Sequence, residues 1–216
     1  SFYQRKEIKD IISYFRLVVN PHDEEALKRI INYPARGIGE TTLNKVIQAA
    51  SDHEVSLYTV LQAPATYGLS VNKGTQTKLD RFVQQIDLWR QAQLQQSAFE
   101  AGIAIIKESG IYADLQQDKS PEGMARVENT EELVNGLKDF CAQRQEEGDE
   151  HISLSDYLSE VSLLSDQDTD DKNSTERITL MTVHSAKGLE FRNVFVVGLE
   201  ENLFPGPRAA ESPRAL

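Results

Sequence analysis

Residues 29–50, RIINYPARGIGETTLNKVIQAA, join two amphipathic helical patterns through a short turn that contains two glycines. Pro34 ends the first pattern, and the second starts near Thr41 or Thr42, either of which can cap a helix. Apolar residues on both sides of the turn recur at helical spacing, so each side predicts a helix with one buried face. This stretch therefore predicts an α-helical fold that contains a helix–turn–helix connection.

Helical periodicity continues through most of the first 165 residues. Ile8, Ile11 and Phe15 belong to the first amphipathic pattern, and residues 20–23 combine a stop signal with a cap for the next helix. The same apolar spacing predicts further helices over residues 57–61, 78–96, 99–109, 126–146 and 153–164, the last capped by Ser153 or Ser155. We therefore expect residues 1–165 to form a mainly α multi-helix bundle.

The pattern changes after residue 165. Residues 166–177 are polar and acidic with no apolar anchor, which is typical of a solvated linker. Residues 178–183 and 194–197 are rich in β-branched residues, which predicts a short C-terminal β segment. We expect residues 178–216 to be a piece of an α/β sheet. Two strands without the rest of their sheet would need to pack on the helices or pair with another copy.

The composition describes a globular chain. It has 216 residues, 39% hydrophobic and 26% charged, which suffices for one sizeable core, or for one domain plus pieces of another. No run of about 18 apolar residues is present, so we expect no membrane partner. One cysteine, Cys141, is compatible with a reducing cytoplasm, and the four histidines show no metal-binding spacing. We predict a cytoplasmic protein with no metal site.

The net charge of −11 argues against nucleic acid, but the charge is unevenly distributed. Residues 1–50 carry eight Lys and Arg against six Asp and Glu, whereas residues 140–176 carry two against eleven. The acidity is therefore concentrated late in the chain. The first fifty residues remain able to meet a phosphate backbone.

The turn Gly37-Ile38-Gly39 is the first candidate binding motif. Its glycines permit a tight turn with uncovered N–H groups, which together with the helix after Thr41 can cradle a phosphate. Ile38 would anchor the turn, and Arg36 and Lys45 could add charge contacts. This arrangement is typical of a helix-hairpin-helix element, which binds the DNA backbone without base recognition. The alternative is an ordinary turn whose glycines serve only geometry.

Residues 182–190, TVHSAKGLE, form the second candidate motif and follow a predicted strand end. The hydroxyl of Thr182, the imidazole of His184 and the ammonium of Lys187 can meet a phosphodiester. Glu190 can accept hydrogen bonds from a ribose or a metal-bound water. The P-loop pattern G-x-x-x-x-G-K-[ST] occurs nowhere in the chain. The alternative is a polar loop that caps a strand, with Glu190 paired to a nearby cation.

Three segments resemble superfamily 1 DNA helicases of the UvrD/PcrA/Rep type. Residues 1–19, SFYQRKEIKDIISYFRLVV, are similar to the start of the 2B subdomain of that family. Residues 29–39, RIINYPARGIG, are similar to the segment that holds the duplex-contacting Gly-Ile-Gly hairpin of 2B. Residues 180–205, LMTVHSAKGLEFRNVFVVGLEENLFP, resemble helicase motif V and its trailing strand.

The resemblance implies an architecture and roles for individual residues. Such helicases have two RecA-like motor domains that bind ATP and Mg²⁺ between them, with 2B inserted in the second motor. By the matched positions, the hairpin residues would contact duplex phosphates, and residues of motif V would contact single-stranded DNA. The implied DNA-binding residues are Arg36, Gly37, Ile38, Gly39, Thr41, Lys45, Thr182, His184 and Lys187. Glu190 and Gly188 would serve the nucleotide side of motif V.

Other motifs of these helicases have no counterpart in the chain. The ATP-binding lysine loop, the Mg²⁺-binding acidic pair and the arginine of motif VI are not found. We therefore expect a fragment of a longer 3′ to 5′ helicase, with no catalytic residues, no bound cofactor and no activity of its own. The polarity comes only from the resemblance.

Two roles remain open for the fragment. The first is a DNA-binding accessory subdomain, whose partners would be the duplex backbone, the junction between single strand and duplex, and the missing motor domains. The second is a regulatory or protein-docking module that restrains the motor or recruits repair proteins, which the acidic balance favours. A nuclease-linked relative of these helicases is a third possibility, although no nuclease carboxylate cluster is present.

Overall fold

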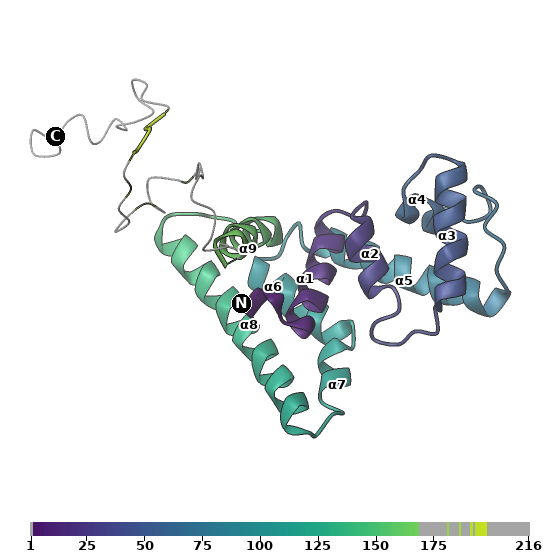
Figure 1. The fold of residues 1–216 in the computed structure, drawn as a ribbon, viewed down its shortest axis with the longest axis horizontal. Coiled ribbons are helices and arrows are strands. Elements are labelled where there is room, and N and C mark those ends of the chain that lie inside the picture. The colour runs from purple at the N-terminus through teal and green to yellow at the C-terminus, as the bar shows by residue number, and fades with distance from the viewer. Residues whose placement is uncertain (1, 169–180, 182–185, 187–190, 192, 198–216) are drawn as a thin grey trace, which may run out of the picture. The chain divides into compact units, whose positions relative to one another are not determined.

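The computed structural model describes residues 2–168 and, beyond them, residues 181, 186, 191 and 193–197 (Figure 1). The chain divides into two units after residue 170, and all the helices that the structure describes belong to the first unit. A short 3-10 helix, Phe2–Gln4, precedes the α-helices. These are α1 (Lys6–Val19), α2 (Glu24–Ile30), α3 (Glu40–Asp52), α4 (Leu57–Gln62), α5 (Lys73–Ala92), α6 (Ala98–Glu108), α7 (Ile111–Leu115), α8 (Pro121–Glu146) and α9 (Leu154–Asp168).

Helix α1 is the centre of the helical unit. Its residues Ile8, Ile11 and Phe15 are fully buried, as the amphipathic spacing predicts. It contacts α2, α5, α6, α8 and α9, so most of the other helices pack on it directly. Burial of apolar side chains from all of these helices in one continuous cluster is the main stabilising force of this unit.

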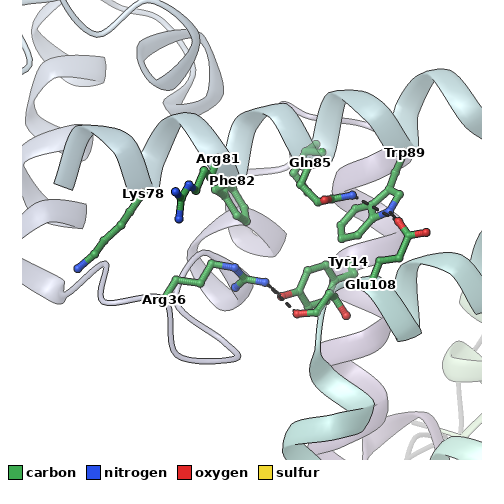
Figure 2. A pocket seen from close by; sticks show the side chains of 10 residues that line it. Tyr14, Arg36, Lys78, Arg81, Phe82, Gln85, Trp89 and Glu108 are labelled. Carbon is green, nitrogen blue, oxygen red and sulfur yellow. Dashed lines mark hydrogen bonds between the residues drawn. The ribbon is translucent and has the colours of Figure 1, made fainter. Parts of the chain in front are cut away.

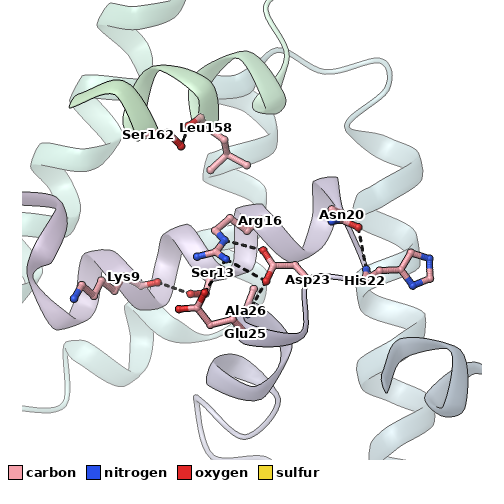
Figure 3. Close-up of polar contacts among 10 residues, drawn as sticks. All are labelled: Lys9, Ser13, Arg16, Asn20, His22, Asp23, Glu25, Ala26, Leu158 and Ser162. Carbon is pink, nitrogen blue, oxygen red and sulfur yellow. Dashed lines mark hydrogen bonds and ion pairs between the residues drawn. The ribbon is translucent and has the colours of Figure 1, made fainter. Parts of the chain in front are cut away.

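The junction between α1 and α2 follows from residues 20–23. Asn20 is the C-cap of α1, and the Asp23 carboxylate caps α2 by accepting the N–H of Ala26 at 3.0 Å. Arg16 of α1 donates to the same carboxylate at 2.8 Å and to Glu25 at 3.1 Å (Figure 3). The predicted stop and cap are confirmed, and the ion pairs fix the angle at which the chain turns back.

Two polar contacts lie at the edge of the core around α1. The guanidinium of Arg29 meets the buried carboxylate of Asp10 at 2.6 Å and ties α2 to α1. Burial raises the pKa of Asp10 against the opposing effect of Arg29. The side chain of Asn129 on α8 donates to Glu7 at 2.7 Å. Buried charge is thus paired or hydrogen-bonded, as burial requires.

Side-chain caps begin most of the remaining helices. Ser56, Asn72, Ser97 and Ser120 each accept an N–H at the start of α4, α5, α6 and α8. Ser153 exchanges hydrogen bonds with Asp156 at the start of α9, which confirms one of its two predicted caps. Helix α3 differs because its N-cap is Gly39, so the prediction of a Thr41 or Thr42 cap is wrong.

Helix α5 connects the two ends of the helical unit. Helices α3 and α4 lie together at one end, and α8 and α9 lie at the other (Figure 1). The helix begins at Lys73, five residues before the predicted start, because Asn72 supplies a cap within the loop. Its N-terminal half passes beside the loop between α2 and α3, which brings Lys78 within hydrogen-bonding distance of that loop.

The mainly α fold is confirmed, and none of the described residues belongs to a β-strand. Residues 193–197 have no regular secondary structure, so the strand predicted at 194–197 is not confirmed. The other predicted strand, at 178–183, lies outside the described residues except for Met181. The helices that the structure describes include none with the length and apolar character needed to cross a membrane.

Candidate nucleic-acid interface

The loop of residues 31–39 between α2 and α3 holds the first candidate motif, and two internal contacts shape it. The Ile38 side chain is buried, only 1% exposed, and anchors the loop in the core as predicted. The amide oxygen of Asn32 accepts the backbone N–H groups of Arg36 and Ile38, each at 3.0 Å. Asn32 therefore holds the loop in the conformation that presents its tip to solvent.

The two glycines of the loop differ in backbone conformation and in the space around them. Gly37 has φ of +71°, in the left-handed region, and a Cβ atom there would lie 2.5 Å from Nζ of Lys78. Gly39 has φ of −78° and ψ of 173°, which any residue can adopt, and a Cβ atom there would meet nothing within 4 Å. The backbone therefore favours a glycine at position 37 and leaves open space around position 39.

The start of α3 presents unsatisfied donors. The carbonyl of Gly39 accepts the N–H groups of Thr42 and Leu43 at 3.0 and 3.1 Å, but Gly39 has no side chain to cap the helix. Among the described residues no acceptor is found for the N–H groups of Gly37, Gly39, Glu40 and Thr41. Helix N-termini with open N–H groups attract anions. The exposed carboxylate of Glu40 opposes this attraction in part.

Arg36 was predicted to contact phosphate, and its side chain instead lies against the protein. The guanidinium donates to the backbone carbonyls of Ile30 at 2.9 Å and Pro34 at 3.2 Å, and to the hydroxyl of Tyr14. It also covers the rings of Tyr14 and Phe82 at 5.7 and 5.5 Å. These contacts give Arg36 a positioning role for the loop, and its predicted DNA contact stays a prediction.

Thr41 and Lys45 lie on α3 and are exposed. The ammonium of Lys45 donates to the carbonyl of Ser70 at 3.1 Å, which joins α3 to the loop before α5. Both side chains remain accessible from solvent. Their predicted contact with a phosphate backbone is compatible with their positions.

The structure adds residues that the sequence did not indicate. Lys78 donates to the carbonyl of Gly37 at 3.3 Å, and Arg81 follows three residues later on α5. Both lie more than forty residues from Gly37 along the chain, so no local pattern indicates them. Asn32 offered a weak signal as a turn-forming residue shortly before Gly37. The helix-hairpin-helix assignment of the loop stays a prediction.

The second candidate motif lies outside the described residues. This applies to Thr182, His184, Lys187, Gly188 and Glu190, so their predicted contacts with single-stranded DNA and nucleotide stay predictions. Within the described part of the chain, no cluster of three His, Cys, Asp or Glu residues has the arrangement of a metal site. Cys141 is buried, and this burial raises the pKa of its thiol.

Residues 1–214 match the UvrD-like helicase C-terminal domain, and the chain belongs to that family. The resemblance to UvrD- and PcrA-type helicases is therefore confirmed.

Known relatives extend over the same region. The chain is 35% identical to DNA helicase II of Haemophilus influenzae, over 100% of this chain and 29% of that protein. It is 37% identical to DNA helicase II of Escherichia coli, over 94% of this chain and 28% of that protein. The identity to the ATP-dependent DNA helicase PcrA of Staphylococcus aureus is 37%, over 98% and 28%. The chain thus spans less than a third of the length of these relatives.

Proposed function

We propose that this chain acts as a duplex-DNA-binding accessory subdomain of an ATP-dependent DNA helicase. The observation that carries the proposal is the open start of α3, where the N–H groups of the exposed residues 39–41 find no acceptor among the described residues, beside a loop anchored by Ile38. Backbone N–H groups bind phosphate without base recognition, which suits an enzyme that must bind any sequence. The names of the relatives, DNA helicase II and PcrA, support DNA as the partner.

The glycine at position 39 allows a direct test. Serine fits the extended backbone there, has open space for its side chain, and is a preferred N-cap residue. Its hydroxyl would accept the N–H of Thr41, one of the donors that the proposal assigns to phosphate. We expect Gly39→Ser to keep or slightly raise the stability of the chain while lowering its affinity for a junction between duplex and single-stranded DNA.

The matched control is Gly136→Ser. Gly136 lies on α8, which packs on α1, α6 and α7, and a Cβ atom there would also meet nothing within 4 Å. Fluorescence anisotropy with a labelled junction at low salt would measure both variants against the parent chain. Equal affinity of Gly39→Ser, Gly136→Ser and the parent would rule out phosphate binding at the start of α3.

The proposal extends to the longer helicase. We infer that ATP and Mg²⁺ bind between two motor domains to which this chain contributes only residues 178–216, that translocation runs 3′ to 5′, and that the chain alone has no ATPase activity. Thr182, His184 and Lys187 would contact single-stranded DNA, and Gly188 and Glu190 would serve the nucleotide. An ATPase assay of the purified chain with single-stranded DNA tests whether the chain alone hydrolyses ATP. Turnover above a no-enzyme blank would contradict the expected lack of activity.

A second candidate function, docking of a protein partner, is favoured by α8. This helix carries six acidic residues against three basic ones, and several of the acids, such as Glu128 and Glu132, are exposed. Such a surface repels DNA and suits a basic protein surface, including that of repair proteins. Reversing Glu128 and Glu132 to lysine would weaken a protein complex under this hypothesis and leave junction binding intact or stronger.

A further inference from the structure

A cleft of about 350 Å³ lies between α5, α1 and the loop of residues 31–39. Its two ends differ in chemistry. Lys78, Arg81 and Arg36 lie toward one end, and Trp89 and Glu108 lie toward the other (Figure 2). The aromatic rings of Tyr14 and Phe82 line the space between them. The cleft therefore has a cationic end that adjoins the proposed DNA-binding loop.

Within the described residues, no carboxylate forms an ion pair with the cations at this end. Six basic residues of the described chain form ion pairs, and they are Arg16, Lys28, Arg29, Arg90, Arg126 and Arg144. Lys78 and Arg81 make none with the carboxylates of that same part, although Asp80 lies between them in sequence. Asp80 instead accepts a hydrogen bond from Gln76 at 2.7 Å. Both cations are exposed and available to an external anion.

Lys78 is held at the loop itself. Its ammonium donates to the carbonyl of Gly37 at 3.3 Å, which leaves its other two donors for a ligand. The absence of a side chain at Gly37 creates the space for this contact. Arg81 follows at i+3, which places it on the neighbouring surface of α5 one turn further from the loop. The two cations thus continue the surface that begins with the open N–H groups of α3.

We propose that Lys78 and Arg81 form a phosphate-binding site for the DNA backbone, adjoining the loop. This inference rests on the proposed function and adds contacts to the same strand beyond those made by backbone N–H groups. A lysine acts as a point charge and an arginine as a two-pronged donor, and both bind phosphates without base recognition.

The opposite end of the cleft carries a carboxylate, so an anion can bind only at the cationic end. The Glu108 carboxylate accepts hydrogen bonds from Trp89 at 2.7 Å and from Gln85 at 3.5 Å. A negative group there repels an anion that would enter more deeply. Arg36 contributes its charge to the field at the cationic end, while its N–H groups remain bonded to protein acceptors.

The test is the salt dependence of junction binding by Lys78→Gln/Arg81→Gln. The slope of log K against log salt is negative, and each phosphate contact contributes about −0.9 to it. The double variant should therefore make the slope shallower by about 2. The matched control is Lys107→Gln/Lys138→Gln, which removes from α6 and α8 two exposed lysines that form no ion pair with any described residue. The control should keep the slope of the parent chain.

A second variant distinguishes the effect of losing positive charge from the effect of distorting the loop. Lys78→Arg/Arg81→Lys retains both charges and should keep most of the slope. A glutamine variant whose slope equals that of the control would overturn the phosphate site while leaving the proposed function intact. A slope that falls equally in the charge-retaining variant would also overturn it, because loop distortion would then explain the loss. Failure of the parent chain to bind the junction at low salt would overturn the proposed function, and this site with it.

Discussion

The guanidinium of Arg36 donates a hydrogen bond to the hydroxyl of Tyr14 and lies over its ring at 5.7 Å. Tyr14 is a fully buried residue of α1, and its hydroxyl in turn donates to the carbonyl of Tyr33. A loop that exposes its tip to solvent is thereby joined to the central helix of the core. The position of the proposed DNA contacts is set by the same packing that stabilises the fold.

Replacing Arg36 with lysine tests this connection. Lysine keeps the charge but cannot reach Ile30, Pro34 and Tyr14 at once, because it lacks the planar fork of arginine. We expect the free energy of unfolding to fall by about 2 kcal/mol in urea denaturation, the range for lost hydrogen bonds to charged groups. Arg126→Lys, at an exposed ion pair, should change it by less than about 0.5 kcal/mol. An equally small change in Arg36→Lys would show that the arginine is not structural.

The stability of the loop should depend on the side-chain oxygen of Asn32, which accepts two hydrogen bonds, and not on its NH₂ group. Asn32→Ala removes the partner of two backbone N–H groups at a site that water can reach, so we expect the free energy of unfolding to fall by about 1 kcal/mol. Asn32→Asp retains the accepting oxygen and should restore most of that loss. Asn44→Ala, at an exposed site on α3, serves as the control and should be neutral. Urea denaturation of the three variants would measure the differences, and a neutral Asn32→Ala would contradict the assignment.

The two loop glycines should respond differently to substitution. Gly37→Ala places a Cβ atom on a left-handed backbone and against Lys78, so we expect a loss of about 1–2 kcal/mol in thermal or urea denaturation. Gly39→Ala should lose no more than about 0.5–1 kcal/mol, since only the N-cap preference changes. Gly37→Asn tolerates the left-handed backbone better and should fall between them. Equal losses at both positions would refute the separation of their roles.

The cap of α9 gives a pH dependence with a defined sign. Hydrogen bonds from the side chain and backbone N–H of Ser153 hold the pKa of Asp156 below its ordinary value of 3.8. The ionised carboxylate therefore stabilises the fold above that value, and this contribution is lost as the pH falls through the lowered pKa. Ser153→Ala should raise the pKa of Asp156 toward its ordinary value and lower stability by about 1 kcal/mol near neutral pH.

Two measurements check this prediction. A nuclear magnetic resonance titration would follow the Asp156 carboxyl group in the parent chain and in Ser153→Ala. Denaturation at about pH 7 and about pH 2 should show a smaller difference between the two proteins in acid, because the ionised carboxylate contributes less stability as the pH falls through its lowered pKa. An unchanged pKa in the variant would mean that another group lowers it.

Local features of the fold were predictable because their causes lie within a few residues. The end of α1 at Asn20, the cap at Asp23 and the burial of Ile38 follow from capping chemistry and helical spacing. The start of α3 was mispredicted for a related reason. Two threonines offered good caps, but the anchored Ile38 sets where the helix can begin, and that places Gly39 at the cap.

The candidate site was predictable only in part. The glycine turn was recognisable because positive φ and exposed N–H groups are properties of a short segment. The role of Arg36 was not, since the partners that decide it include Tyr14 in α1 and Ser109 after α6. Lys78 reaches Gly37 from 41 residues away, and nothing in the pattern around either residue indicates this contact.

The sequence alone therefore determined the helical class, the glycine turn and the helicase family, because periodicity, backbone restrictions and motif order are written along the chain. The tertiary structure decided which cations are available to a ligand. Whether an arginine points to solvent or to carbonyl oxygens depends on which helices pack together, and packing is a property of the whole core. Packing turned Arg36 toward the protein and placed Lys78 and Arg81 beside the loop.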